Sequence, residues 1–403
     1  MKPHRFHPET ESVHGAADLE KRNAPMAQPI YQTSTFKVTD SHEQLRVTST
    51  DMFYTRYGNP THTAVERAIA ELEGADAALL FASGMNAITT SILALVKTGD
   101  HIVAQRDIYG GVTKFLSAWL PKLGVETTFV DTTDYQQHQS AIRPNTKLLY
   151  LESPTNPTLR VVDLAKVVAI AREHKLTTFI DATFATPINM RPVDAGIDVV
   201  LHSGTKYLSG HTDLICGVAA GRQGLIDTIR QTRTTLGGCM DPHAAFLLLR
   251  GIKTLAVRVA RQNASALKIA HFLDAHSGVR SVNYPFLEKH PQRALAMQQM
   301  NGGGGVVSFE VNGSGEDAKK MSESLHLFTL APSLGGVESL VSIPVLTSHA
   351  MISAEHRQKM GVTDQLVRLS VGIENTDDLI ADLDQALKTA VPSARHAETV
   401  AVR

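Results

Sequence analysis

The alternation of short apolar segments with segments of helical periodicity limits the fold of this chain more than any other feature. It begins at about residue 62 and continues to residue 201. Neighbouring parallel strands need a long crossover connection, usually a helix, so the alternation favours a mainly parallel sheet with helices on both faces. The sequence therefore predicts an α/β fold. The expected helices are residues 63–73, 86–97, 111–123 and 164–174, and the expected strands are residues 77–81, 102–104, 127–130, 148–151, 178–180 and 197–201.

Composition and charge limit the partners. A chain of 403 residues allows two or three domains, and 43% apolar with 20% charged residues is typical of a folded soluble protein. A formal net charge of −1 gives no basic field for nucleic acid. The first residues lack the apolar core of a signal peptide, and no apolar run is long enough to span a bilayer. We therefore expect a cytoplasmic protein without nucleic-acid or membrane partners.

Two regions of the sequence carry little chemistry. Residues 1–60 are polar and turn-rich, with Pro25, Pro29 and Pro60, and we interpret them as an arm rather than a domain. Only Cys216 and Cys239 are present, and neither has the paired spacing of metal ligands. We expect two ordinary buried or partly buried thiols, no disulfide scaffold and no metal.

Polar residues and glycines follow the expected strands. In sheets of this kind, ligands bind beyond the carboxyl ends of the strands. One crevice could therefore collect these residues. They are Ser83, Gly84 and Met85 after strand 77–81, Tyr109 after strand 102–104, Glu152 and Asn156 after strand 148–151, Asp181 after strand 178–180, and Ser203, Thr205 and Lys206 after strand 197–201.

Lys206 lies among hydroxyl and glycine residues at the point where a strand should end. A pyridoxal phosphate enzyme needs a lysine that bonds covalently to the cofactor while nearby hydroxyls hold the cofactor phosphate. We interpret Lys206 as that amine, with Ser203 and Thr205 as the hydroxyls. The alternative is an ordinary solvated lysine beyond a strand.

Other residues at the ends of the strands have a task in such a site. Gly84 and Met85 open a helix whose free N–H groups favour a phosphate, although an ordinary strand-to-helix turn looks the same. The Asp181 carboxylate could keep the pyridine nitrogen protonated, so that the ring accepts electrons; the alternative is a capping or turn aspartate. Tyr109 could stack on the ring or simply lie at the edge of the core.

Ordered motifs extend this pattern along nearly the whole chain. They are YTRYGNPT at 54–61, ASGM at 82–85, ESPTNP at 152–157, HSGTKYLSGH at 202–211, SLGGVESL at 333–340 and RLSVGIE at 368–374. Together they resemble the Cys/Met-metabolism family of pyridoxal phosphate enzymes, which includes cystathionine γ-synthase, cystathionine γ-lyase and methionine γ-lyase.

The resemblance implies the fold type I architecture of pyridoxal phosphate-dependent transferases. Residues 1–60 would form an N-terminal arm that contacts a neighbouring subunit, residues 61–255 the cofactor-binding domain, and residues 256–403 a smaller C-terminal α/β domain. It also implies a homotetramer built from two dimers, with active sites shared across the dimer interface.

The resemblance also implies roles for individual residues. Tyr54 and Arg56 would bind the phosphate of the partner's cofactor, and their i, i+2 spacing suits an extended segment. Catalysis would rest on Lys206, Tyr109 and Asp181. Cofactor binding within the chain would involve Ser83, Gly84, Met85, Tyr109, Asn156, Asp181, Thr183, Ser203, Thr205 and Lys206.

The substrate residues implied by the resemblance lie mostly late in the sequence. Arg368 would hold the substrate carboxylate, because a planar guanidinium grips a carboxylate with two hydrogen bonds. Ser333 and Asn156 would assist it. Glu338 could bind the distal ammonium group of a cysteine or cystathionine moiety; the alternative is a solvated glutamate in a glycine-rich loop.

The activity is predicted less sharply than the fold. Ala182, where most relatives carry asparagine, resembles plant-type cystathionine γ-synthases, and Gly111 replaces the cysteine usual in methionine γ-lyases. Our first expectation is cystathionine γ-synthase, which joins a homoserine ester and cysteine. The alternatives are cystathionine γ-lyase, and methionine γ-lyase or an O-acylhomoserine sulfhydrylase. A pyridoxal-binding carrier or scaffold is the non-enzyme alternative. The presence of Lys206, Asp181 and Arg368 disfavours it, because a carrier without catalytic turnover would not need all three.

Overall fold

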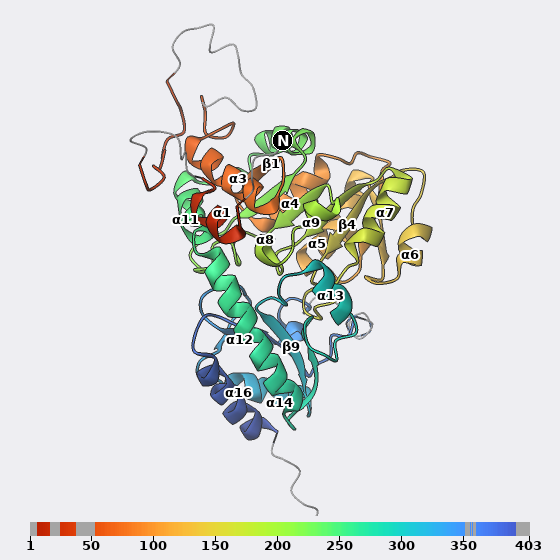
Figure 1. Cartoon of the computed structure of the whole chain (residues 1–403). Coiled ribbons are helices and arrows are strands. Elements are labelled where there is room, and N and C mark those ends of the chain that lie inside the picture. Colours follow the sequence, from red (N-terminus) through yellow and green to blue (C-terminus); the bar gives the residue numbers. More distant parts are fainter. Residues whose placement is uncertain are drawn as a thin grey trace, which may run out of the picture. The chain divides into compact units, whose positions relative to one another are not determined.

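The computed structural model describes residues 6–16, 25–37, 53–350, 355, 357 and 360–391. The chain divides into two compact units (Figure 1). Unit 1 comprises the described residues up to Thr155, with Arg160–Val259 and Gln299–Asn301. Unit 2 comprises Asn156–Leu159, Ala260–Gln298 and the described residues from Gly302 onward. The expected arm 1–60 and domains 61–255 and 256–403 stay predictions.

Unit 1 is built on a seven-stranded sheet with the order β1-β7-β6-β5-β4-β2-β3. β7 pairs antiparallel with β1 and β6, and the other pairs are parallel, which confirms the predicted mainly parallel sheet. The strands are β1 (Ala77–Phe81), β2 (His101–Gln105), β3 (Glu126–Val130), β4 (Thr146–Glu152), β5 (Thr177–Asp181), β6 (Val199–His202) and β7 (Gly217–Gly221).

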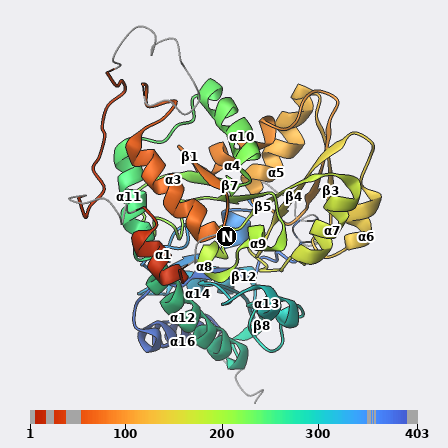
Figure 2. The ribbon, with the colours of Figure 1, turned by 45° about the horizontal axis from the view of Figure 1, so that its top comes forward.

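Helices cover both faces of this sheet. Side chains along a strand alternate between faces, and both sets are buried: Phe179 packs on one face, while Ile180 points to the other, and both are fully buried. α4 and α10 lie next to β7 (Figure 2). The helices of this unit are α1 (Pro8–His14), α3 (Pro60–Glu73), α4 (Gly84–Leu93), α5 (Gly110–Lys114), α6 (Tyr135–Ser140), α7 (Leu164–His174), α8 (Thr186–Asn189), α9 (Pro192–Ala195), α10 (Gln223–Leu236) and α11 (Pro242–Ile252).

Side-chain caps fix the starts of several of these helices. Asn59 accepts a hydrogen bond from Thr61 N at the start of α3, and Asp163 accepts one from Lys166 N at the start of α7. The predicted helix 111–123 is wrong as a single helix. It consists of α5, a π-helical segment (Phe115–Trp119) and a 3₁₀ segment (Leu120–Leu123), because the proline at 121 lacks an N–H for a continuous α-helical ladder.

The described part of the amino-terminal region includes an element that the sequence did not indicate. It contains a helix, α1, and Arg67 of α3 donates a hydrogen bond from Nε to the Gly15 carbonyl at 3.0 Å. The segment with Tyr54 and Arg56 is not extended as expected: the Tyr54 carbonyl accepts hydrogen bonds from the amides of Tyr57 and Gly58, which makes a turn.

Unit 2 contains a smaller five-stranded sheet with the order β10-β11-β12-β9-β8. Its pairs are antiparallel apart from β10 with β11. Residues such as Phe309, Leu369 and Leu383 form its apolar core. The strands are β8 (Val279–Asn283), β9 (Val306–Val311), β10 (Thr329–Leu330), β11 (Leu340–Ser342) and β12 (Leu366–Ser370). The helices are α13 (Arg293–Gln299), α14 (Gly315–Glu323), a 3₁₀ segment (Pro344–Leu346) and α16 (Thr376–Ala390), while α12 (Leu255–Ala275) spans the division between the units.

Among the described residues, no helix is long and apolar enough to cross a membrane. Cys216 is buried and Cys239 is partly buried, as predicted.

Candidate active site

The carboxyl ends of β4, β5 and β6 lie level with one another in the sheet. Glu152 is opposite Asp181, and Asp181 is opposite Leu201. Glu152 and Asp181 are the last residues of their strands rather than the first residues beyond them, and Ser203 directly follows β6. The structure therefore brings these predicted residues to one edge of the sheet, although their roles in binding stay predictions.

The Asp181 carboxylate is held by Thr183. Asp181 Oδ1 accepts hydrogen bonds from the Thr183 amide at 2.9 Å and the Thr183 hydroxyl at 2.5 Å, and the same hydroxyl accepts one from Ser203 N at 2.9 Å. Burial raises the pKa of Asp181, against the effect of the Thr183 hydrogen bonds and the charge of His202. Because both bonds use Oδ1, Oδ2 is left for a further donor. The protonated pyridine nitrogen of pyridoxal phosphate could be that donor, and its positive charge would keep the buried carboxylate ionised.

Gly84 and Ser203 form a tight cradle at the start of α4. A Cβ atom at Gly84 would lie 2.9 Å from both Cβ and Oγ of Ser203, so only glycine fits there. Ser83 caps the helix by accepting a hydrogen bond from Asn86 N at 3.1 Å. The free N–H groups of the first turn, together with the Ser203 hydroxyl, make a donor set that suits a phosphate group.

The main chain around Lys206 is fixed on both sides. Its amide donates to the Ser203 carbonyl at 3.1 Å, and its carbonyl accepts from Gly210 N at 2.8 Å. The Thr205 hydroxyl accepts from Cys216 N at 2.9 Å. Thr205 thus ties the lysine loop to the start of β7, a structural task that the sequence did not indicate. The Lys206 side chain is half-buried.

Tyr109 lies beside the first residues of α4 and α5. A Cβ atom at Gly111 would lie 2.6 Å from Tyr109 Cε1 and 3.1 Å from the sulfur of Met85. The Tyr109 amide donates to Glu152 Oε2 at 2.7 Å. The Tyr109 side chain is 44% exposed, so its ring is accessible for stacking.

In unit 2, Arg368 is buried in the middle of β12. Its Nη1 donates to Asn156 Oδ1 at 2.9 Å, and its Nη2 donates to the Ser333 carbonyl at 3.0 Å. Both predicted helpers of Arg368 thus contact it. These two acceptors are neutral, and they orient the guanidinium.

The loop that carries Glu338 is tied to the segment after β12. Ser339 donates from its amide to Glu374 Oε1 at 2.6 Å and from its hydroxyl to Glu374 Oε2 at 2.8 Å, and the hydroxyl accepts from Gly372 N at 2.9 Å. Glu338 itself is exposed, on a loop whose backbone is well anchored.

Tyr54 and Arg56 lie near the end of α10 of their own chain. Arg56 Nη1 donates to the Thr234 carbonyl at 2.8 Å, and the guanidinium carbon is 5.0 Å from the centre of the Tyr57 ring and 5.7 Å from that of Tyr54. Their expected contact with a partner's cofactor stays a prediction.

Sequence reasoning missed two buried histidines near predicted site residues. They are His202, next to Ser203, and His349, near Arg368. His202 Nε2 lies 2.5 Å from Glu73 Oε1, and both side chains are fully buried. In unit 2, burial and the charges of Arg368 and Arg357 lower the pKa of His349 to about 4, so it is neutral near pH 7. The sequence signal for His202 was its position directly before Ser203. Its pairing with Glu73 could not be predicted, because the two residues are 129 positions apart.

Comparison with known proteins agrees with this geometry. The family model described as Cys/Met metabolism PLP-dependent enzyme matches residues 9–388. A cystathionine γ-lyase of Bacillus subtilis is 42% identical over 380 residues, which cover 94% of this chain and 98% of the relative. A cystathionine β-lyase, MetC, of the same organism is 42% identical over 393 residues, which cover 97% and 99%.

A solved structure gives the same result. Cystathionine γ-lyase from Lactobacillus plantarum, complexed with L-serine, has a TM-score of 0.89 and 39% identity, and the match covers 96% of this chain and 99% of that one. The buried Asp181 and the cradle at Gly84 fit the cofactor of this family. The chain therefore belongs to the Cys/Met metabolism family of PLP-dependent enzymes, and it is a trans-sulfuration enzyme with pyridoxal 5'-phosphate as its cofactor.

Proposed function

We propose that this enzyme is a C–S lyase that cleaves cystathionine at its γ-carbon, with water, to cysteine, 2-oxobutanoate and ammonia. The observation that carries the proposal is the likeness over nearly the full length to cystathionine lyases, together with a buried guanidinium, Arg368, held by neutral acceptors. This changes the order of our expectations, because the relatives are described as lyases rather than as the synthase that we placed first.

Residues of unit 1 would hold the cofactor. Its phosphate would lie at the start of α4, against the amides of Gly84 and Met85 and the Ser203 hydroxyl. Asp181 would face the ring nitrogen and Tyr109 the ring. When bound, pyridoxal phosphate supplies a ring that accepts the electrons released at the substrate Cα.

Lys206 would serve as base and acid. Its amine would take a proton from Cα and return protons at later steps, so it must be neutral for part of the cycle. The fixed main chain on both sides of Lys206 limits where the amine can reach.

Residues of unit 2 would select the substrate. Arg368 would grip the α-carboxylate with its planar fork, and Asn156 and Ser333 would fix the plane of that fork. Glu338 would attract the distal ammonium group of cystathionine from an exposed position on an anchored loop. The Glu338 carboxylate thus favours cystathionine over methionine, because methionine has no distal ammonium group.

Gly111 further disfavours methionine γ-lyase activity. A cysteine there, as methionine γ-lyases usually carry, would place its Cβ 2.6 Å from the Tyr109 ring. Cystathionine γ-synthase is the second candidate, because residues 178–192, 232–263 and 329–345 resemble plant-type synthases. We also expect a cytoplasmic homotetramer with small amino-acid substrates.

Product analysis tests the proposal. The purified holoenzyme is given cystathionine, methionine, or an O-succinyl-, O-acetyl- or O-phosphohomoserine with and without cysteine, and the products are identified by mass spectrometry. We expect 2-oxobutanoate and cysteine from cystathionine. Pyruvate and homocysteine would instead indicate β-cleavage, and cystathionine formed only from an ester and cysteine would indicate the synthase.

A further inference from the structure

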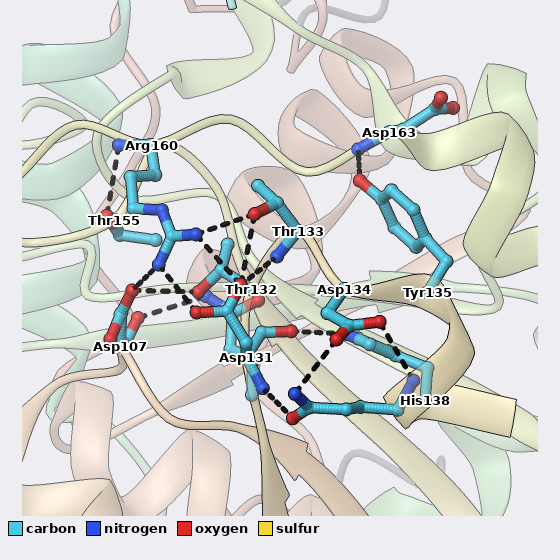
Figure 3. A network of polar contacts seen from close by, with 12 residues as sticks. Asp107, Asp131, Thr132, Thr133, Asp134, Tyr135, His138, Thr155, Arg160 and Asp163 are labelled. Atoms are coloured by element: carbon cyan, nitrogen blue, oxygen red, sulfur yellow. Dashed lines mark hydrogen bonds and ion pairs between the residues drawn. The ribbon is translucent and has the colours of Figure 1, made fainter. Parts of the chain in front are cut away.

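We propose that Arg160 is a positioning residue that holds Tyr109 in place by joining the loops at the carboxyl ends of three adjacent strands. Its guanidinium makes four short contacts (Figure 3). Nη1 donates to Asp107 Oδ2 at 2.7 Å and to Asp131 Oδ2 at 3.1 Å. Nη2 donates to Asp131 Oδ1 at 2.8 Å and to the Thr133 hydroxyl at 2.6 Å.

Arg160 and its three partners lie in three different loops of the sheet. Asp107 follows β2, Asp131 and Thr133 follow β3, and Arg160 itself follows β4. Because β2 lies between β4 and β3 and pairs parallel with both, the three loops leave the sheet at the same edge. One side chain therefore fixes the spacing of these loops.

The charges of this cluster support each other. Burial acts to raise the pKa of Asp131, but the hydrogen bonds from Arg160 and Thr133 and the Arg160 charge outweigh it and hold the pKa at about 2. Asp131 is therefore ionised near pH 7. Asp107 is almost fully buried, and its other hydrogen-bond donor is the hydroxyl of Thr132 at 3.0 Å. Loss of the guanidinium would leave the buried Asp107 carboxylate with the neutral Thr132 hydroxyl in place of a charged partner. The loop would then have to shift to bring the carboxylate toward water.

That loop leads directly to Tyr109. Gln105 donates from Nε2 to the carbonyls of Asp107 at 3.0 Å and Glu152 at 2.8 Å, and the Tyr109 amide donates to Glu152 Oε2. The segment is thus fixed at Asp107 by Arg160 and at Tyr109 by Glu152. A shift at Asp107 would strain or break the second attachment and move the ring of Tyr109.

The main chain of Arg160 has a separate task that a side-chain substitution leaves intact. Its amide donates to the Thr155 hydroxyl at 3.1 Å, and its carbonyl accepts from Thr155 N at 3.0 Å. These bonds close the loop that contains Asn156. We therefore expect the guanidinium to act on the cofactor side, through Tyr109, with little effect on the KM for substrate.

The test compares Arg160→Met with Arg143→Met in the holoenzyme. Arg143 also pairs with a carboxylate, Glu126, but on the surface, so it is a matched control for the loss of an ion pair. We expect amide hydrogen exchange in residues 106–112 to become about tenfold faster in Arg160→Met and to stay unchanged in the control. Arg160→Lys should recover part of the protection, because it keeps the charge near Asp107.

Cofactor affinity gives the second readout, and it rests on the proposed role of Tyr109. Arg160→Met should weaken pyridoxal phosphate binding in the wild-type background and have no further effect when Tyr109→Ala is present. An equal loss in both backgrounds, or unchanged exchange in residues 106–112, would overturn the positioning role. If Arg160→Met fails to fold, Asp107→Asn replaces it with the same expectations. Hydrogen exchange does not depend on turnover, so a wrong lyase assignment would leave this test intact.

Discussion

At the scale of single residues, Lys206 combines a fixed main chain with a side chain that is only half-buried. Lys206→Ala should remove the covalent bond to the cofactor while leaving those main-chain hydrogen bonds in place. We expect the variant to fold, to lose the visible absorbance of the covalently bound cofactor, and to gain no cofactor mass after borohydride reduction.

Lys166, whose side chain is 61% exposed, provides the matched control for this lysine experiment. Lys166→Ala should keep both the colour and the fixed cofactor. Persistence of both in Lys206→Ala would move the covalent role to another lysine.

Arg368 allows a test of geometry separately from charge. Arg368→Lys keeps the positive charge but loses the planar fork that Asn156 and Ser333 orient. One lost charge-assisted hydrogen bond corresponds to about 1.5–3 kcal/mol, so KM should rise about 10- to 150-fold with a smaller change in kcat. Steady-state kinetics with cystathionine measures this, and Arg280→Lys, an exposed change in β8, should have no effect. An unchanged KM would remove Arg368 from the substrate site.

Residue placement was predictable wherever a strand preceded the residue. Ser203 directly follows its strand as predicted, and Asp181 lies one position earlier than predicted, at the end of its strand; both reach one edge because parallel strands end there. The partners of these residues were not predictable. Arg160 contacts Asp107 across 53 residues of sequence, and a single arginine in a loop carries no sign of which carboxylate it will meet.

At the scale of elements, the apolar strands of unit 1 were predicted well, whereas β7 and the strands of unit 2 were not predicted individually. The sequence of β7, GVAAG, has small residues and no alternation. It is a strand because Gly217 and Gly221 allow close approach: a Cβ there would lie 2.2 Å from the Ser83 carbonyl and 2.3 Å from that of Asp198. Helix α1 was missed because it is short, with Pro8 at its start in a polar segment.

The buried pair of Glu73 and His202 joins the end of α3 to the end of β6. Glu73→Ala would leave the His202 ring buried without this partner, so we expect the free energy of unfolding to fall by about 2–4 kcal/mol. Glu73→Gln keeps an acceptor oxygen and should lose about half as much. Urea denaturation of the holoenzyme measures both changes.

Glu173, exposed near the end of α7, is the control for that pair. Glu173→Ala should change the free energy of unfolding by less than about 0.5 kcal/mol. Equal losses in the Glu73 and Glu173 variants would show that the buried pair has no special weight.

At the scale of the whole molecule, the α/β class was predictable from periodicity, and the smaller C-terminal domain was predictable only from the family resemblance of the ordered motifs. The assembly was less predictable than the fold, because contacts within one chain do not show which residues contact a partner subunit. Arg56 makes such contacts, with the Thr234 carbonyl and the Tyr57 ring, whereas the family resemblance assigns it to the partner's cofactor. The two descriptions predict different outcomes when chains are mixed.

Co-expression of Arg56→Ala chains with Lys206→Ala chains decides between them. If Arg56 acts across the dimer, each mixed dimer contains one site with an intact Lys206 from one chain and an intact Arg56 from the other. Random pairing makes half of the dimers mixed, so about a quarter of wild-type activity should return. The control replaces Arg56→Ala by Arg368→Ala, which we expect to act in the same chain as Lys206, and it should restore nothing. Activity that stays at the level of the separate variants in the first mixture would assign Arg56 to its own subunit, where the Thr234 carbonyl already holds it.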